Sequence, residues 1–224
     1  MTYPVRLHQE AAAILNQLFH LDAPRLLLQG AGVSLLRQTE FGIFFHQEDG
    51  WVLDPVSGIV LDPSQVRAIY ALPGERGEVP RLAFEFPRQT LSILPSQQQE
   101  AFQRVCEAFS ASGMPAEETS RIPPLWLDEW GTACSAAAPQ DLRRRAGRTD
   151  WYALLSEASE IELSLEGQGV RSEVRFCPGM IDREASILKV ADPSQQHVLY
   201  LDEVQFRGDL RRKGMGTAQV SCLG

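Results

Sequence analysis

The chain has 224 residues, of which 44% are hydrophobic and 22% are charged, a composition typical of a globular protein with one large or two small domains. Its formal net charge of −8 argues against a nucleic-acid partner, because phosphate binding depends on a positively charged face. Its apolar runs are shorter than the roughly 20 residues that span a bilayer. Residues 1–6 lack the layout of a signal peptide, so we expect a cytoplasmic protein with no membrane insertion.

The first half of the chain alternates between strand-forming segments and turn signals, after a helix. Apolar residues at spacings of three and four predict an amphipathic helix over 8–20. The predicted strands that follow are 26–28, 33–37, 42–46, 51–53, 59–61, 66–72, 81–86 and 90–94. Their short connections favour an antiparallel meander, because parallel crossovers need a dozen residues or more. A helix over 97–109 is expected to close this unit.

The middle of the chain differs in composition from the predicted strands. Residues 110–150 are rich in Ala, Pro, Ser and Arg, and Pro139-Gln140-Asp141 is typical of a helix start. We interpret this region as a helical connector, with a helix near 140–158.

After the connector, the pattern of the first half begins again. Gly30-Ala31-Gly32-Val33 matches Gly167-Gln168-Gly169-Val170 at an offset of 137 (167 − 30). Asp54-Pro55 matches Asp192-Pro193 at an offset of 138 (192 − 54). The same offset relates Val52, Val60, Leu61, Val66 and Leu72 to Val190, Val198, Leu199, Val204 and Leu210. A one-residue insertion reconciles both stretches, so the sequence predicts an internal duplication.

The predicted fold is α+β, with tandem-duplicated antiparallel β-meander units that each carry packing helices. The first unit covers 1–110, the connector 111–158 and the second unit 159–224. The second unit is expected to be incomplete, because the last residue aligns near Phe86 and the strand 90–94 and helix 97–109 have no counterparts. An open strand edge and an apolar face would result, and a homodimer through this unit would cover them.

Two such units in tandem resemble the HemS/ChuX-like bacterial haem-utilisation proteins. The resemblance is carried by 32–40, 59–62, 66–70, 81–86 and Ala101-Phe102, and by 187–193 followed by His197-Val198-Leu199. It implies a split-barrel-like fold with two stacked sheets and haem in a cleft beside one of them. It also implies a cytoplasmic protein that binds haem, passes it on and in some members assists ring opening.

A haem site needs an axial donor for the iron, cations for the two propionates and an apolar slot. By the resemblance, Arg81 matches an arginine expected at a propionate or on the distal side of haem. The family's ligating histidine lies between the halves, whereas this chain has no histidine between His46 and His197. His197 is therefore the candidate iron ligand, and His46 a further candidate haem contact. Structural roles stay open for all three, such as pairing of Arg81 with Glu78 or Glu85.

Two other functions stay open. A non-catalytic scaffold or interaction protein would keep the fold without haem. An acetyl-CoA-dependent N-acetyltransferase is a third candidate, because residues 211–216 fit the pyrophosphate-binding pattern R-x-x-G-x-G. That loop must open a helix, however, whereas residues 220–223 predict a strand.

Overall fold

The computed structural model describes residues 5–7, 10–30, 32–72, 80–95, 99–113, 125–127, 133–135, 150–184, 187–203, 205–206, 208–214 and 216–223. In these ranges the protein is α+β, with mostly antiparallel sheets and short helices. The helices are α1 (Ala11–Leu15), η1 (Leu18–His20), η2 (Pro63–Gln65), α2 (Gln99–Ala108) and α4 (Trp151–Ser156). None of the described helices is long and apolar enough to cross a membrane.

The strands of the first half are β1 (Val5–Leu7), β2 (Arg25–Gly30), β3 (Val33–Gln38), β4 (Phe45–His46), β5 (Val52–Asp54), β6 (Ile59–Leu61), β7 (Ala68–Leu72), β8 (Arg81–Glu85), β9 (Gln89–Leu94) and β10 (Ser110–Gly113). A short pair follows, β11 (Leu125–Leu127) with β12 (Ala133–Ser135). The second half contains β13 (Glu160–Glu166), β14 (Val170–Phe176), β15 (Met180–Glu184), β16 (Ile187–Ala191), β17 (His197–Asp202), β18 (Gly208–Arg212) and β19 (Thr217–Leu223).

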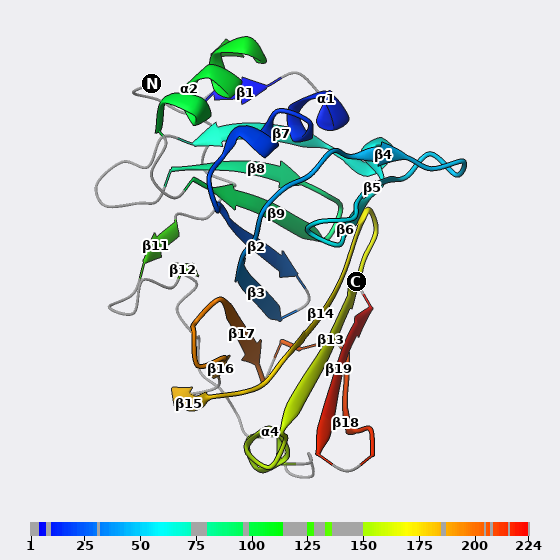
Figure 1. Ribbon diagram of the computed structural model, residues 1–224, viewed down its shortest axis with the longest axis vertical. Coiled ribbons are helices and arrows are strands. Elements are labelled where there is room, and N and C mark those ends of the chain that lie inside the picture. Colours follow the sequence, from blue (N-terminus) through cyan, green and yellow to red (C-terminus); the bar gives the residue numbers. More distant parts are fainter. Residues whose placement is uncertain are drawn as a thin grey trace.

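Two large sheets form the body of the molecule (Figure 1). A ten-stranded sheet has the order β10-β1-β7-β8-β9-β2-β3-β17-β16-β15, and a seven-stranded sheet has the order β18-β19-β13-β14-β6-β5-β4. Each described sheet has two end strands, so neither closes into a barrel.

The main core lies between the two sheets. Strands such as β14 alternate strictly between buried and exposed residues, the pattern of a sheet with one face in a core. One cluster joins Leu26, Leu28 and Leu35 of the ten-stranded sheet to Leu163 and Val170 of the seven-stranded sheet. We call the face of the ten-stranded sheet in this cluster its inner face. Its opposite, outer face carries two separate buried clusters: Leu27, Leu36, Leu94, Ala191 and Val198, and Ala68, Tyr70, Leu72 and Ala83.

Each sheet contains strands from both halves of the chain. The β5–β6 hairpin pairs with β14 through Leu61↔Val170, and the β16–β17 hairpin pairs with β3 through Leu199↔Leu35. Strands that lie 137 or 138 residues apart hold equivalent positions. The equivalent strands are β7 and β18, β8 and β19, β2 and β13, β3 and β14, β6 and β17, β5 and β16, and β4 and β15.

The simple meander expected from the sequence is therefore wrong at one point. The chain leaves the ten-stranded sheet after β3 and builds β4, β5 and β6 in the other sheet. Alternating hydrophobicity fixes which face a side chain takes, but the neighbouring strand is selected by packing between residues far apart in sequence.

One described pair of strands departs from the equivalence. In the ten-stranded sheet β9 lies between β8 and β2, whereas in the seven-stranded sheet β19 lies directly beside β13. These two strands run parallel, from Glu160↔Thr217 to Glu166↔Leu223. In the described structure β13, the equivalent of β2, is therefore paired on that side with β19.

The repeated Gly-x-Gly turns hold the halves together. Gly32 (φ +79°) lies so near the other half that an added Cβ would come within 2.7 Å of Phe206 Cα. Gly169 (φ +115°) faces the first half, where a Cβ would lie 2.8 Å from Gln65 Cβ. Their carbonyls accept hydrogen bonds from Asp202 N (2.9 Å) and Asp62 N (2.8 Å). Glycine is required at both positions because of its positive φ and the close backbone contact.

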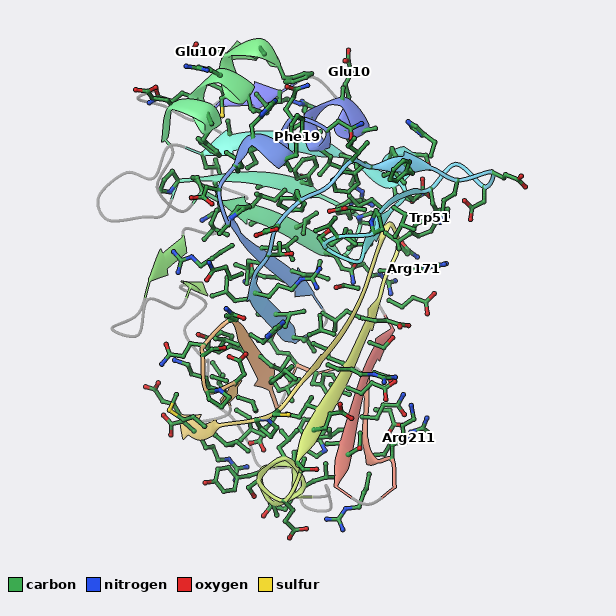
Figure 2. The ribbon with its side chains drawn as sticks, viewed as in Figure 1. Glu10, Phe19, Trp51, Glu107, Arg171 and Arg211 are labelled. Carbon is green, nitrogen blue, oxygen red and sulfur yellow. The ribbon has the colours of Figure 1, made fainter. Side chains whose placement is uncertain are left out.

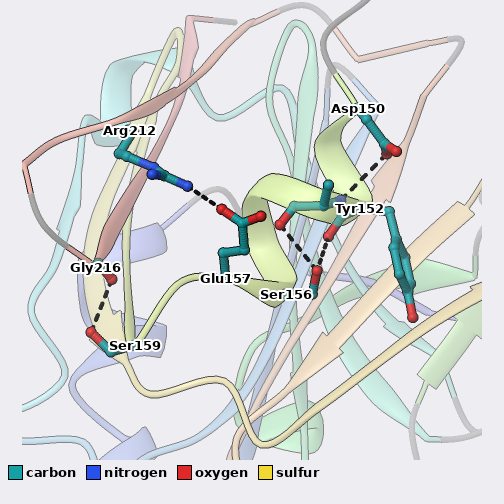
Figure 3. A network of polar contacts seen from close by, with 8 residues as sticks. Asp150, Tyr152, Ser156, Glu157, Ser159, Arg212 and Gly216 are labelled. Carbon is teal, nitrogen blue, oxygen red and sulfur yellow. Dashed lines mark hydrogen bonds and ion pairs between the residues drawn. The ribbon is translucent and has the colours of Figure 1, made fainter.

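The helices match the expected positions in part. The helix expected over 8–20 is divided into α1 and η1, and the one expected over 97–109 is α2. Of the helix expected near 140–158, the described part is α4, whose first turn is capped by Asp150 through Ala153 N (3.3 Å, Figure 3). The remainder, at 140–149, lies outside the described residues, as does His8 at the start of the helix expected over 8–20.

Candidate functional site

The three site residues expected from the sequence lie in three different places. His46 is exposed on β4, the end strand of the seven-stranded sheet. His197 begins β17 and pairs with Arg37, which pairs with Leu26, so all three share the inner face. Arg81 begins β8 and pairs with Leu72, a member of an outer-face cluster. The structure therefore does not bring Arg81 and His197 to the same side of the sheet.

His197 is held by the turn that precedes its strand. Its Nδ1 lies 3.1 Å from Asp192 Oδ2, and its backbone N donates to Asp192 Oδ1 (3.3 Å). Its ring stacks on Phe176 with a centroid distance of 5.6 Å and an interplanar angle of 7°. Burial tends to raise the pKa of Asp192, but hydrogen bonds from His197 and Ser194 outweigh it and lower that pKa. This arrangement closes the Asp-Pro turn and leaves Nε2 as the ring nitrogen for any ligand.

A fully buried aspartate holds the equivalent Asp-Pro turn of the first half. Asp54 is fully buried and accepts hydrogen bonds from Gly42 N (3.2 Å), Val56 N (3.0 Å) and Ser57 N (3.2 Å). The Arg37 guanidinium donates to the Ser57 carbonyl. Burial lowers the pKa of Arg37 to about 10, although the charge of Asp54 opposes that shift. The group fixes the β5–β6 turn against β3, a structural role.

A contact on the other side of the seven-stranded sheet is also structural. The Arg171 guanidinium of β14 lies 4.3 Å from the centroid of the Trp51 ring, beside the start of β5 (Figure 2). Arg171 also pairs with Glu166 at 3.1 Å. Such exposed contacts add little stability but cover apolar ring surface. Within the described residues, His, Cys, Asp and Glu side chains form no group of three that could hold a metal ion.

The outer face of the ten-stranded sheet combines an apolar floor with one buried arginine, Arg81, and one partly buried arginine, Arg25. Arg81 is only 4% exposed, although charged residues are rarely buried to this degree. Leu82 of β8 pairs with Ile93 of β9, so the next residue of each strand places Arg81 beside Leu94. On its other side, Leu94 pairs with Arg25 of β2. Arg25 and Arg81 therefore lie on either side of Leu94, two strand spacings or about 10 Å apart.

Burial also affects Arg25, because desolvation lowers its pKa from the usual value. The floor around the two arginines is made of Leu27, Leu36, Leu72, Ala83 and Leu94, all buried. An apolar floor with two cations at one border suits a flat apolar ligand that carries two anionic groups. We call this area, from Arg6 and Tyr70 across to Arg25, the outer-face site.

Sequence reasoning found Arg81 but missed Arg25, Arg6 and Tyr70. Arg6 and Tyr70 are register partners on β1 and β7, and both take the outer face. Residues 66–72 indicate a strand that contains Tyr70, but they do not alternate between polar and apolar types, so they do not show which face Tyr70 takes. Its cationic neighbours come from other strands. The order of the strands was needed to bring them together.

The structure argues against the acetyltransferase candidate, because Arg211 and Arg212 are the last residues of β18 and Gly216 is followed directly by β19. β18 and β19 pair in antiparallel register, and Lys213 N donates to Thr217 O (2.8 Å). The Gly216 carbonyl accepts from Ser159 Oγ at 3.0 Å, and Arg212 pairs with Glu157 (Figure 3). A pyrophosphate loop needs its amides at the start of a helix, whereas here a strand follows.

No protein-family model matches the sequence, and no curated protein matches it. Solved structures do match. The haem-degrading enzyme ChuS of Escherichia coli O157:H7 superposes with a TM-score of 0.66 at 13% identity, covering 96% of this chain and 75% of that one. Apo-PhuS, a haem-binding protein of Pseudomonas aeruginosa, has a TM-score of 0.60 at 12% identity, covering 91% and 71%. Holo-PhuS has a TM-score of 0.58 at 12% identity, covering 96% and 76%. The chain thus shares the fold of these haem-binding and haem-degrading proteins.

Proposed function

We propose that the protein binds haem at the outer-face site and acts in haem trafficking or utilisation. The observation that carries this proposal is the buried Arg81 guanidinium on an apolar sheet face, in a chain with the fold of PhuS and ChuS. A haem propionate carries the negative charge and the oxygen acceptors that a guanidinium binds.

The residues of the site fit haem in size and charge. The floor residues come from five adjacent strands, β3, β2, β9, β8 and β7, and the four spacings between them add up to roughly 19 Å, about the width of a porphyrin. Arg81 and Arg25 would hold the two propionates, and the leucines of the floor would contact the ring and exclude water. Haem would supply a redox-active iron. His197 lies on the inner face and would not reach the same haem, so its role as iron ligand would require a separate site.

We also propose that units 1–110 and 159–224 arose by duplication around the connector 111–158. The equivalent order of strands in the two sheets supports this duplication. A cytoplasmic location stays a prediction, as does a homodimer through 159–224. Sedimentation equilibrium of the purified protein tests the dimer.

A haemin titration followed in the visible spectrum tests the function. We expect a saturable Soret band, and we expect Arg81→Met and Arg25→Met each to weaken binding by about 10- to 100-fold, because a hydrogen bond to a charged group is lost. Arg211→Met is the matched control, because Arg211 is 64% exposed on β18 at the far end of the other sheet (Figure 2). Circular dichroism and urea midpoints confirm that each variant is folded.

Two outcomes contradict the proposal. One is the absence of saturable haemin binding by the folded protein, which supports the scaffold alternative. The other is equal affinity of Arg81→Met, Arg25→Met and Arg211→Met. The scaffold alternative has one observation in its favour: His197 lies on the inner face of the ten-stranded sheet, and His46 lies in the other sheet.

A further inference from the structure

The hairpin of β4 and β5 carries exposed apolar side chains, and a cluster of such side chains on a protein surface indicates an interaction site. Phe45 of β4 is 56% exposed, and Ile43, just before that strand, is 61% exposed. Val56, in the turn after β5, is 58% exposed and lies beside Gly42, where an added Cβ would come within 2.7 Å of Val56 Cγ2. Figure 1 shows the hairpin projecting from the body of the molecule.

The strand registers place Phe45 in an apolar row. Phe45 pairs with Leu53 of β5, and Leu53 pairs with Val60 of β6. Register partners point to the same face of a sheet, so the three side chains lie side by side across three strands. Their neighbours along β5 and β6 are buried between the two sheets, whereas Leu53 and Val60 are only partly buried. The row therefore lies on the solvent face of the seven-stranded sheet, and we call it, together with Ile43 and Val56, the hairpin surface.

The same solvent face is charged on the next strand. On β14 it carries Arg171, Glu173 and Arg175, which are all exposed, and Arg171 is the register partner of Val60. Polar side chains of this kind are what a solvated sheet face normally carries. The change from charged to apolar residues between β14 and β6 distinguishes the hairpin surface from the face around it.

The equivalent residues in the ten-stranded sheet are covered. Leu53 and Val60 correspond to Ala191 and Val198 at the offset of 138 (191 − 53 and 198 − 60). Ala191 and Val198 are 1% and 0% exposed, in a cluster on the outer face of that sheet. The same face of equivalent strands is thus buried in one sheet and open in the other, which favours a role for the open one in binding a partner.

The charges around the hairpin surface indicate the chemistry of that partner. Glu48 and Asp49 are exposed in the β4–β5 turn, and Glu173 is exposed on β14. The cation at this border, Arg171, already pairs with Glu166 at 3.1 Å. The excess charge is negative, so it repels an anionic membrane and a second copy of the same surface, and it attracts lysine and arginine.

We propose that the hairpin surface docks an extended segment of a partner protein that combines aliphatic or aromatic residues with lysine or arginine. β4 is an end strand of its sheet, so the segment adds beside it as a further strand. The apolar side chains of the segment contact Phe45 and Leu53, and its basic side chains contact Glu48 and Asp49. This interaction is independent of haem binding.

Selection of short random peptides displayed on phage tests the proposal on the full chain. We expect the wild type to enrich peptides that combine apolar residues with lysine or arginine. An enriched peptide, synthesised with a fluorescein label, should bind Phe45→Ser about 10-fold more weakly by fluorescence anisotropy, because an apolar contact is lost. The double variant Glu48→Gln/Asp49→Asn should also bind it more weakly, and this difference should shrink at high salt.

Tyr152→Ser is the matched control, because Tyr152 is 38% exposed on α4, outside the hairpin, and its affinity for the peptide should equal that of the wild type. Circular dichroism and urea midpoints confirm that the variants are folded. The proposal is overturned if the wild type enriches no peptides, if the enriched peptides are acidic, or if Phe45→Ser binds them as tightly as the wild type.

Two further measurements identify a different occupant, and either result also overturns the proposal. A wild-type dimer that Phe45→Ser converts to a monomer in sedimentation equilibrium assigns the hairpin surface to a second copy of this chain. Cosedimentation with vesicles of anionic phospholipid that Phe45→Ser abolishes assigns it to a membrane.

Discussion

Replacing Gly32 by alanine probes how closely the two halves of the chain are packed. Gly32 sits in the β2–β3 turn with φ +79°, and its carbonyl accepts the hydrogen bond from Asp202 N at 2.9 Å. An added Cβ would lie 2.7 Å from Phe206 Cα, well inside the ordinary contact distance. Phe206 has little room to move, because it is fully buried and packs edge-on against Trp151 at 5.1 Å.

Three costs add up in this variant. An alanine at positive φ costs about 1 kcal/mol. Separating the turn from Phe206 weakens a backbone hydrogen bond, a loss of about 1 kcal/mol. Overpacking of a rigid core costs about 1–3 kcal/mol. We therefore expect Gly32→Ala to lower the free energy of unfolding by about 3–5 kcal/mol.

Urea denaturation at pH 7 measures the effect, with Gly50→Ala as control. Gly50 has a similar φ of +85° but nothing within 4 Å of an added Cβ, so its replacement should cost only the backbone term of about 1 kcal/mol. If the two variants lose the same free energy, within about 0.5 kcal/mol, the close contact between the halves does not contribute to stability and the reasoning is refuted.

Two further predictions concern the two Asp-Pro turns. Asp54→Ala should lower the free energy of unfolding by about 3–5 kcal/mol, because Arg37 stays buried without its nearby counter-charge. In a double-mutant cycle, adding Arg37→Met to Asp54→Ala should recover part of this loss. If the losses of the two single variants simply add in the double variant, Arg37 and Asp54 do not interact. Folding lowers the pKa of Asp192. Its carboxylate therefore stabilises the folded protein fully at pH values above the pKa in the unfolded chain, about 3.9. This stabilisation is lost as the pH falls through the pKa of Asp192 in the folded protein. The stability difference between wild type and Asp192→Asn should therefore be largest near neutral pH and shrink below about pH 4, and a difference that is constant with pH would count against the pair with His197.

Local patterns predicted the strands well but not their neighbours. The hairpin of β2 and β3 follows from apolar runs around a glycine turn, and such turns depend on residues adjacent in sequence. The pairing of β3 with β17, about 160 residues later, follows from packing between the two sheets. No periodicity in either strand indicates which partner it takes.

The candidate site was predictable to the same limited degree. Arg81 was found through a resemblance, and its burial is consistent with a special role. Arg25 and Tyr70 share its face only because β2, β9, β8 and β7 are neighbours in that order. His197 looked suitable because it follows an Asp-Pro turn, but the structure turns its ring toward Phe176 and Asp192 on the inner face.

The exchange of hairpins between the two sheets constrains how the chain is synthesised. β3 obtains its second neighbour only from β17, and β6 only from β14, so both strands wait at open edges until those residues have left the ribosome. Open apolar edges attract other chains. The nascent first half should therefore depend on chaperones or on rapid translation of the second half, and slow codons placed between them would favour aggregation over completion of the fold.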